Sequence, residues 1–302
     1  MFPSFFGLTR TTLNCGMSLL RKLITRFLLN AVVVWRAAVK TAYDGRLFAG
    51  SQRQPDLPTV EGEIIETLKE LKAIRNEKSS RFKAASRTDR GVSALGNVFA
   101  FDTEFRKSEL LRAMNSVARN LYFYAVAETP IDFSPRRAKA RWYRYWLPNF
   151  GFDIDLMMKC ALLFEGKHDF RQFCRYDGRS TKRTISKIAV SACGNYIAID
   201  FIARDFLWNM VRKIMSAMTM VASGRATIED IKRGLNGEFV DFGIAPAENL
   251  ILMDVSYDIS FQVERPMTLV RKITQGKTDA FLKSFFFDHL DKVSGLSLNG
   301  YL

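Results

Sequence analysis

The stretch AASRTDRGVSALGNVFAF, residues 84–101, decides the fold and the candidate chemistry of this chain. At its centre, Asp89 follows an arginine and a threonine and stands two residues before Gly91. Aspartate near glycine is typical of a tight turn, so we expect Asp89 on a loop that leads into a strand. A carboxylate in that position can point into a cleft. Because so short a motif is weak evidence alone, its weight depends on the rest of the chain.

Size and charge limit the possible classes of protein. With 302 residues, of which 48% are apolar, the chain can fill about two domains or one large one around a substantial core. Its formal net charge is +14. This excess of positive charge indicates either an ordinary solvated surface or a polyanionic partner, such as nucleic acid or an anionic membrane.

Cysteine and histidine usage argues against several kinds of site. The four cysteines form no C-x-x-C pair, and there are only two histidines. This pattern favours neither a zinc site nor a disulfide framework, and it is typical of a reducing compartment such as the cytoplasm. We therefore expect no metal site, and the sequence also carries no phosphate-binding glycine motif. No apolar run approaches the ~18 residues of a spanning helix, and we expect no membrane segment.

Hydrophobic periodicity predicts alternating strands and helices. Strands are expected at 35–43, 81–86, 97–102, 121–127, 184–192, 195–203 and 250–258, with strand character over 134–150. Helices are expected at 59–74, 108–119, 153–165, 206–222, 228–236 and 278–292. The similar order before and after about residue 150 predicts an α+β fold, in which two similar α/β halves share a mainly antiparallel sheet flanked by helices.

The segment FSPRRAKARWYRYW, residues 133–146, is basic and aromatic. Strand alternation places Tyr143 and Tyr145 on one face and Arg144 on the other. The pattern fits an amphipathic strand with a charged outer face. It also fits a groove in which cations follow phosphates and an aromatic ring stacks on a base, and the net charge favours this second interpretation.

Two further basic features follow. Residues 171–187 carry six cations against one acid in a loop that contains glycine and serine, which favours a phosphate-contacting loop. In the apolar helix that begins RDFLWNMVRKI, Arg212 and Lys213 are the only charged residues between 206 and 224. An arginine at the edge of so apolar a helix needs an anionic partner, either a structural carboxylate or Asp89.

The first forty residues contain six basic residues and no acidic one. They fit a transit peptide, a signal sequence interrupted by Asn30, or an appended or mis-started segment with Met17 as an internal start. We favour the third, because the family resemblance described next begins only near residue 38.

Six segments in order resemble the tRNA pseudouridine synthase A family, over about residues 38–260. They are KTAYDGRLFAGSQRQ (40–54), ASRTDRGVSALGNV (85–98), FSPRR with ARWYRYW (133–146), GKHDFRQFCR (166–175), DFLWNMVRKI (205–214) and PAENLILMDVSYD (246–258). Ser86, Arg90 and Ser93 differ from residues common in the family, and their combination is more similar to the archaeal branch.

The resemblance implies the pseudouridine synthase fold, with a catalytic cleft between the halves. It implies conversion of uridine to pseudouridine in the anticodon stem and loop of tRNA, as in synthases acting at tRNA positions 38, 39 and 40. Asp89 matches the nucleophile, Tyr143 the tyrosine that stacks on the target base, and Arg87 and Arg212 arginines that bind substrate or keep the carboxylate ionised. It implies a homodimer with tRNA as its partner and no cofactor. Contacts to the RNA backbone are expected from Arg136, Arg141, Arg144, Arg179 and Lys182.

The expected organisation is an extension (1–34), an N-terminal half with the catalytic loop (35–150), a C-terminal half (151–265) and a helical tail (266–302). Three alternatives remain open: an RNA-binding protein without activity, a hydrolase with a carboxylate pair, and a membrane-associated protein led by its N-terminus.

Overall fold

The computed structural model describes residues 33–294, built of ten strands and seven helical segments. The strands are β1 (Trp35–Tyr43), β2 (Lys83–Ala84), β3 (Ser93–Thr103), β4 (Leu121–Thr129), β5 (Ala140–Pro148), β6 (Gly166–Asp169), β7 (Lys182–Cys193), β8 (Tyr196–Ala203), β9 (Leu250–Ser256) and β10 (Gln262–Val263). The helices are the 3₁₀ turn η1 (Gly45–Leu47), α2 (Val60–Glu70), α3 (Lys107–Val117), α4 (Ile154–Phe164), α5 (Met210–Ala222), α6 (Ile228–Leu235) and α7 (Met267–Ser294). The predicted extension, 1–34, falls almost entirely outside the described residues.

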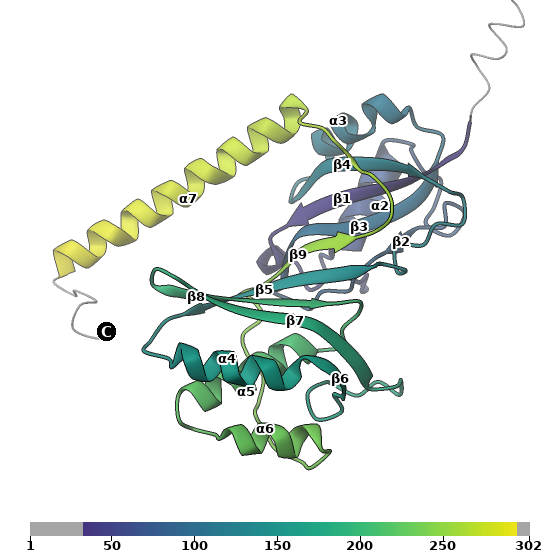
Figure 1. The fold of residues 1–302 in the computed structure, drawn as a ribbon. Coiled ribbons are helices and arrows are strands. Elements are labelled where there is room, and N and C mark those ends of the chain that lie inside the picture. Colours follow the sequence, from purple (N-terminus) through teal and green to yellow (C-terminus); the bar gives the residue numbers. More distant parts are fainter. Residues whose placement is uncertain (1–32, 295–302) are drawn as a thin grey trace, which may run out of the picture. The chain divides into compact units, whose positions relative to one another are not determined.

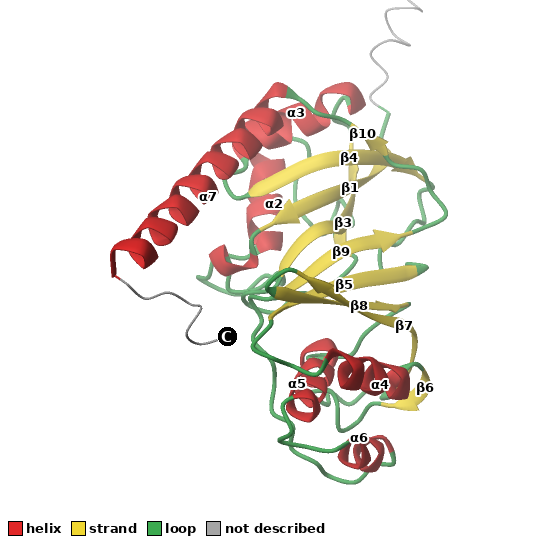
Figure 2. Ribbon diagram, turned by 60° about the vertical axis from the view of Figure 1, so that its left-hand side comes forward, coloured by secondary structure: helices red, strands yellow, loops and turns green. Residues whose placement is uncertain are grey.

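All ten strands join one mixed sheet, in the order β10-β4-β1-β3-β9-β5-β8-β7-β6, with β2 added on β3 (Figure 1; β10 is labelled in Figure 2). Among the described strands only β3 and β9 pair in parallel, and the other pairings are antiparallel. The predicted α+β fold with a shared, mainly antiparallel sheet is therefore confirmed.

The two halves interlock at the centre of this sheet. The parallel pairing is short, with Ser93 opposite Ile251 and Ala94 opposite Leu252. Although β5 precedes residue 150, it pairs with β8 and β9, both of which come later in the chain. A division at residue 150 thus separates β5 from its partners. The centre of the sheet is built from strands of both halves, and this ties one half to the other.

Helices α2 to α6 contribute buried apolar residues to the core, whereas α7 is largely exposed. Figure 2 shows α2 and α3 beside the sheet. In α2, Ile64 and Leu68 are fully buried, and Thr59 caps the first turn by accepting a hydrogen bond from the Gly62 amide. In α5, Met210 and Ile214 are inaccessible to solvent and belong to the core. Within the described residues no helix is both long and apolar enough to cross a bilayer.

Several predicted boundaries were wrong. Helix α5 begins at Met210 instead of 206, because Asn209 adopts a left-handed conformation (φ +62°) that breaks the helical path before it. Helix α7 begins at Met267 instead of 278. Its first turns have little apolar periodicity but are held by tertiary contacts: Leu269 is buried, and the Lys272 ammonium donates to the carbonyls of Ala118 and Leu121. The short strands β6 and β10 were not predicted.

Substitution of Gly96 tests the close approach of β3 to β9 at the centre of the sheet. A Cβ atom at this position would lie 2.5 Å from the Asp254 carboxylate and 2.8 Å from the Met253 carbonyl oxygen of β9. We therefore expect Gly96→Ala to lower the free energy of unfolding by about 1–3 kcal/mol, in the range of overpacked sites. Urea denaturation measures this. As a control, Gly276→Ala in α7 has only the Tyr122 hydroxyl near its new Cβ, at 3.9 Å, and helix propensity predicts no loss. Equal stability of Gly96→Ala and wild type would contradict the proposed close approach.

Candidate active site

A cleft of about 800 Å³ opens beside the centre of the sheet and is lined from both halves. The loops at 49–54 and 84–92 come from the first half, and the segments at 175–179 and 205–212 come from the second. Seven arginines line it against four acidic residues. The arginines are Arg87, Arg90, Arg136, Arg141, Arg175, Arg179 and Arg212, and the acids are Glu61, Asp89, Asp177 and Asp205. The lining is thus positive, as expected for a site that receives a polyanion.

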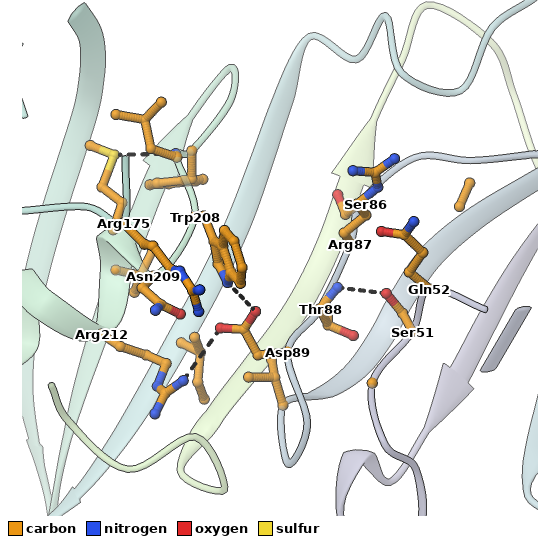
Figure 3. Close-up of a pocket in the computed structure, with 18 of the residues that line it drawn as sticks. Ser51, Gln52, Ser86, Arg87, Thr88, Asp89, Arg175, Trp208, Asn209 and Arg212 are labelled. Atoms are coloured by element: carbon orange, nitrogen blue, oxygen red, sulfur yellow. Dashed lines mark hydrogen bonds and ion pairs between the residues drawn. The ribbon is translucent and has the colours of Figure 1, made fainter. Parts of the chain in front are cut away.

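Asp89 lies in this cleft between two donors from the second half (Figure 3). The indole Nε1 of Trp208 donates to Oδ1 at 3.1 Å, and the Arg212 guanidinium donates to Oδ2 at 3.3 Å. The Asp89 side chain is 30% exposed and that of Arg212 17%. The Arg212 Nε also donates to the Ala245 carbonyl at 2.8 Å, which fixes the guanidinium. The sequence left either a structural carboxylate or Asp89 as the partner of Arg212, and in the structure the partner is Asp89.

The loop that carries Asp89 is fastened by a buried polar network. The Thr88 amide donates to Ser51 Oγ at 2.7 Å, and the Thr88 hydroxyl lies 2.9 Å from the Tyr43 hydroxyl. Asn97 Nδ2 donates to both the Tyr43 hydroxyl and the Ser86 carbonyl, each at 3.1 Å. Since these groups are buried, losing one partner leaves another polar atom unsatisfied. The network therefore fixes the path of the loop.

Glycine completes the turn, as predicted. Gly91 has φ +87°, a conformation that side chains rarely tolerate, and its amide donates to the Gly45 carbonyl at 3.2 Å. Gly45 in turn lies so close to Val92 that an added Cβ would overlap the Val92 carbonyl. These two glycines let the Asp89 loop lie directly against the turn after β1.

Tyr143 faces the cleft from β5. Its side chain is buried, and its ring meets the ring of Phe206 edge to face at 5.3 Å. Burial raises the pKa of Tyr143 to about 12, against the opposing influence of the Arg141 charge. The hydroxyl is therefore protonated at neutral pH. The predicted alternation holds, since Tyr145 is buried as well and Arg144 is half-buried among partners outside the cleft.

Arg87 lines the cleft but does not pair with Asp89. In Figure 3 its guanidinium points away from the Asp89 carboxylate, on the side of Gln52. Its positive charge instead acts on Glu61. Burial raises the pKa of the Glu61 carboxyl above its usual value, and the charges of Arg87 and Arg136 partly oppose that rise. Of the two arginines predicted beside the carboxylate, Arg212 is the one in contact with it.

The arginines predicted to contact RNA have different surroundings. Arg136 and Arg179 line the cleft. Arg141 also reaches it but is buried, and it donates to Ser86 Oγ at 2.9 Å and to the Ala85 carbonyl at 2.8 Å. Arg144 forms a two-pronged ion pair with Asp200, with both hydrogen bonds at 2.8 Å. The donors of Arg141 and Arg144 are thus engaged within the protein.

Lys182 lies beside the main cleft in a smaller one of about 210 Å³. Lys167, Arg183 and Arg204 also line this smaller cleft, and Asp205 borders both. The positive lining thus continues from the Asp89 cleft toward β6 and β7.

Sequence reasoning missed Trp208 as a neighbour of Asp89. The residue was visible in the segment DFLWNMVRKI, but a helix was predicted from 206, and that gave its ring no particular direction. Arg175 was counted only within a basic cluster, yet its guanidinium lies 4.1 Å from the centre of the Trp208 ring. The described residues contain no group of three or more histidine, cysteine, aspartate or glutamate side chains able to hold a metal ion.

Comparisons with known proteins point to one family. The sequence model of the family described as tRNA pseudouridine synthase matches residues 160–258. The chain is 44% identical to tRNA pseudouridine synthase A of Pyrococcus abyssi, over 74% of the chain and 85% of that protein. It is 43% identical to tRNA pseudouridine synthase A of Pyrococcus furiosus, over 76% and 86%. The crystal structure of a Cbf5-Nop10-Gar1 complex matches with a TM-score of 0.34 and 11% identity, over 61% of this chain and 44% of that one.

Burial of Tyr143 predicts a loss of stability in alkali. In the unfolded chain the tyrosine titrates near 10, whereas in the folded protein its pKa is about 12. As the pH rises from about 10 to about 12, the unfolded chain releases this proton first, so unfolding becomes more favourable. We expect Tyr143→Phe to lose less stability than wild type over this interval, by up to about 2–3 kcal/mol. Urea denaturation at pH 8, 10 and 11 measures the difference, of which about half is expected by pH 11. Identical pH dependence in both proteins would contradict it.

Proposed function

Because the chain belongs to the tRNA pseudouridine synthase A family, we propose that Asp89 is the nucleophile with which it isomerises uridine in tRNA. The chain is a tRNA pseudouridine synthase, an isomerase. The finer proposal is that its targets lie in the anticodon stem and loop, at tRNA positions 38, 39 and 40. The observation that carries the proposal is the Asp89 carboxylate, held between Arg212 and Trp208 in a positive cleft.

The reaction needs a carboxylate and no external reagent. The bond from the sugar to N1 of uracil breaks, the base turns, and a bond from the sugar to C5 forms. The proton on C5 is lost and one is gained at N1, so product and substrate have the same composition. Asp89, as an ionised carboxylate, supplies the electron pair that starts the exchange. The Arg212 guanidinium, which donates to Asp89 Oδ2 at 3.3 Å, offsets the charge of the carboxylate when RNA excludes water.

We propose that Tyr143 positions the target base. It projects from β5 into the cleft that holds Asp89. Since its raised pKa keeps the hydroxyl protonated, the resting residue is a hydrogen-bond donor and not a base. Its ring can stack on the uracil while Asp89 acts on the nucleoside. The uridine must leave its helical stack to arrive there, which costs a few kcal/mol.

Phosphate contacts offset that cost. We propose that Arg87 and Arg136, which line the cleft, and Lys182 beside it contact the RNA backbone. Arg179 is paired with Asp177, but its side chain is 65% exposed, so we propose that it too can reach a phosphate. Such contacts release counterions and make affinity fall with salt. For Arg141 and Arg144, whose donors are engaged within the protein, we propose a supporting role: they brace the Asp89 loop and β5 instead of binding phosphate.

The proposed setting is the cytoplasm. This proposal rests on the wide spacing of the cysteines, which favours no disulfide framework and is typical of a reducing compartment. We further propose that the enzyme acts as a homodimer, with tRNA spanning both subunits.

Replacement of the carboxylate tests the mechanism. Asp89→Asn keeps the shape of the side chain but removes its nucleophilic charge, so we expect pseudouridine formation to fall at least 10³-fold, as when a covalent nucleophile is removed. Unmodified tRNA is incubated with each protein, and pseudouridine is mapped at single-nucleotide resolution. Wild type is expected to modify positions 38, 39 and 40 where these are uridine.

The matched control is Asp155→Asn, the same change at an exposed site in the first turn of α4, which should modify tRNA normally. Retained activity of Asp89→Asn would refute the proposed nucleophile. Retained tRNA binding with no activity even in wild type would instead support an RNA-binding protein without catalysis, and release of free uracil would indicate a hydrolase.

The oligomeric state can be measured directly. A chain of 34.5 kDa that forms a homodimer should show about twice that mass by light scattering at micromolar concentration, with and without tRNA. A single species at the monomer mass in both samples would contradict the homodimer.

A further inference from the structure

Trp208 stands out because it is a large aromatic residue kept partly in solvent beside the carboxylate. Its neighbours in sequence, Leu207 and Met210, are buried, whereas Trp208 is 42% exposed. Asn209, directly after it, has φ +62°. A left-handed conformation is unfavourable for a residue other than glycine, and such conformations cluster at functional sites. The turn anchors the chain on both sides of Trp208 and directs its ring into the cleft.

The indole makes a specific contact with the carboxylate. Its N–H donates to Asp89 Oδ1, while Arg212 holds Oδ2. An indole N–H can only donate a hydrogen bond, and it does not titrate near neutral pH. It therefore fixes the carboxylate plane without taking part in proton transfer. With both oxygens engaged by separate donors, rotation of the Asp89 side chain is restricted.

The ring of Trp208 is itself held in place. The Arg175 guanidinium lies 4.1 Å from the ring centre, and the Arg175 amide donates to the Trp208 carbonyl at 2.8 Å. An aromatic ring paired with an arginine and open to solvent is suited to stack on a nucleic-acid base, with the guanidinium available to a phosphate. In Figure 3 both side chains lie on the same side of Asp89.

We propose that Trp208 is a positioning residue that links RNA binding to the orientation of Asp89. Its ring stacks on a base of the bound tRNA, and its N–H holds the carboxylate in the attacking orientation. Stacking on the ring limits its motion, which in turn limits the motion of the carboxylate. The inference rests on the proposed role of Asp89 as nucleophile and adds a residue and a substrate contact to it.

Two substitutions separate the two parts of the proposal. Trp208→Phe retains an aromatic face but removes the N–H, so we expect tRNA affinity within about threefold of wild type and a kcat reduced roughly 10- to 100-fold, as for a lost hydrogen bond to a charged group. Trp208→Ala removes both, so we expect in addition that affinity falls roughly 5- to 100-fold, as for a lost stacking contact. If Trp208 had a purely structural role, Trp208→Phe would not lower kcat while leaving tRNA affinity nearly unchanged.

Intrinsic fluorescence gives a readout that needs no turnover. The chain has four tryptophans, Trp35, Trp142, Trp146 and Trp208. Stacking of a base quenches indole emission, so titration with unmodified tRNA should quench wild type, and most of that quenching should vanish in Trp208→Phe. The matched control is Trp142→Phe. Trp142 also donates its N–H to an aspartate, Asp200 at 2.6 Å, but does not line the cleft, so quenching and activity should persist.

The outcomes are distinct. Quenching as large in Trp208→Phe as in wild type would overturn the stacking contact, and an unchanged kcat in that variant would overturn the positioning role. Either result, with Asp89→Asn inactive and wild type active, leaves the proposed nucleophile intact. If wild type forms no pseudouridine, the proposed function fails, while the fluorescence titration still decides whether RNA stacks on Trp208.

Discussion

The ion pair between Asp89 and Arg212 sets the main constraint on this structure. The two residues are 123 positions apart in sequence, and both side chains are more than half buried. A charge removed from water needs a partner in good geometry, and loss of that geometry leaves an uncompensated charge. The pair can form only if the two halves hold a fixed relative position. Much of the architecture around the cleft can be understood as meeting that requirement.

Two features of the sheet supply the fixed position. The parallel contact of β3 with β9 and the placement of β5 between β9 and β8 make the halves parts of one hydrogen-bonded surface. The loop before β3 is then fastened to β1 through the hydroxyls of Tyr43 and Thr88 and the amide of Asn97. On the opposite side, Arg212 is fastened through its bond to the Ala245 carbonyl. Each member of the pair is therefore positioned by its own rigid support.

Local pattern predicted most of the helices and strands, though not all of their boundaries, and it did not predict the partners of charged residues. Period-two alternation along 140–148 correctly separated Tyr143 from Arg144, and a glycine after Asp89 correctly predicted the turn. Yet Arg141 and Arg144 look equivalent in sequence, and both were expected to contact RNA. Arg141 is engaged by Ser86 and backbone carbonyls, and Arg144 by Asp200. Those acceptors lie in β8 and in loops distant in sequence. Counting charges in the sequence therefore overestimates the number of cations that remain available to a ligand. The left-handed Asn209 was missed because asparagine favours that conformation only weakly.

The same distinction between engaged and available cations separates the arginines of the cleft into two groups. Within the described residues, Arg212 and Arg179 are paired with carboxylates that also line the cleft, whereas Arg87, Arg90, Arg136 and Arg175 form no ion pair with a side chain. The unpaired arginines carry most of the uncompensated positive charge, so the phosphates of a polyanion gain most free energy at their positions. A neutral base gains little there, which agrees with the proposed stacking of bases on Tyr143 and Trp208 instead. On the proposed function, affinity for RNA would therefore depend mainly on the unpaired arginines, and chemistry on Asp89, whose charge Arg212 already compensates.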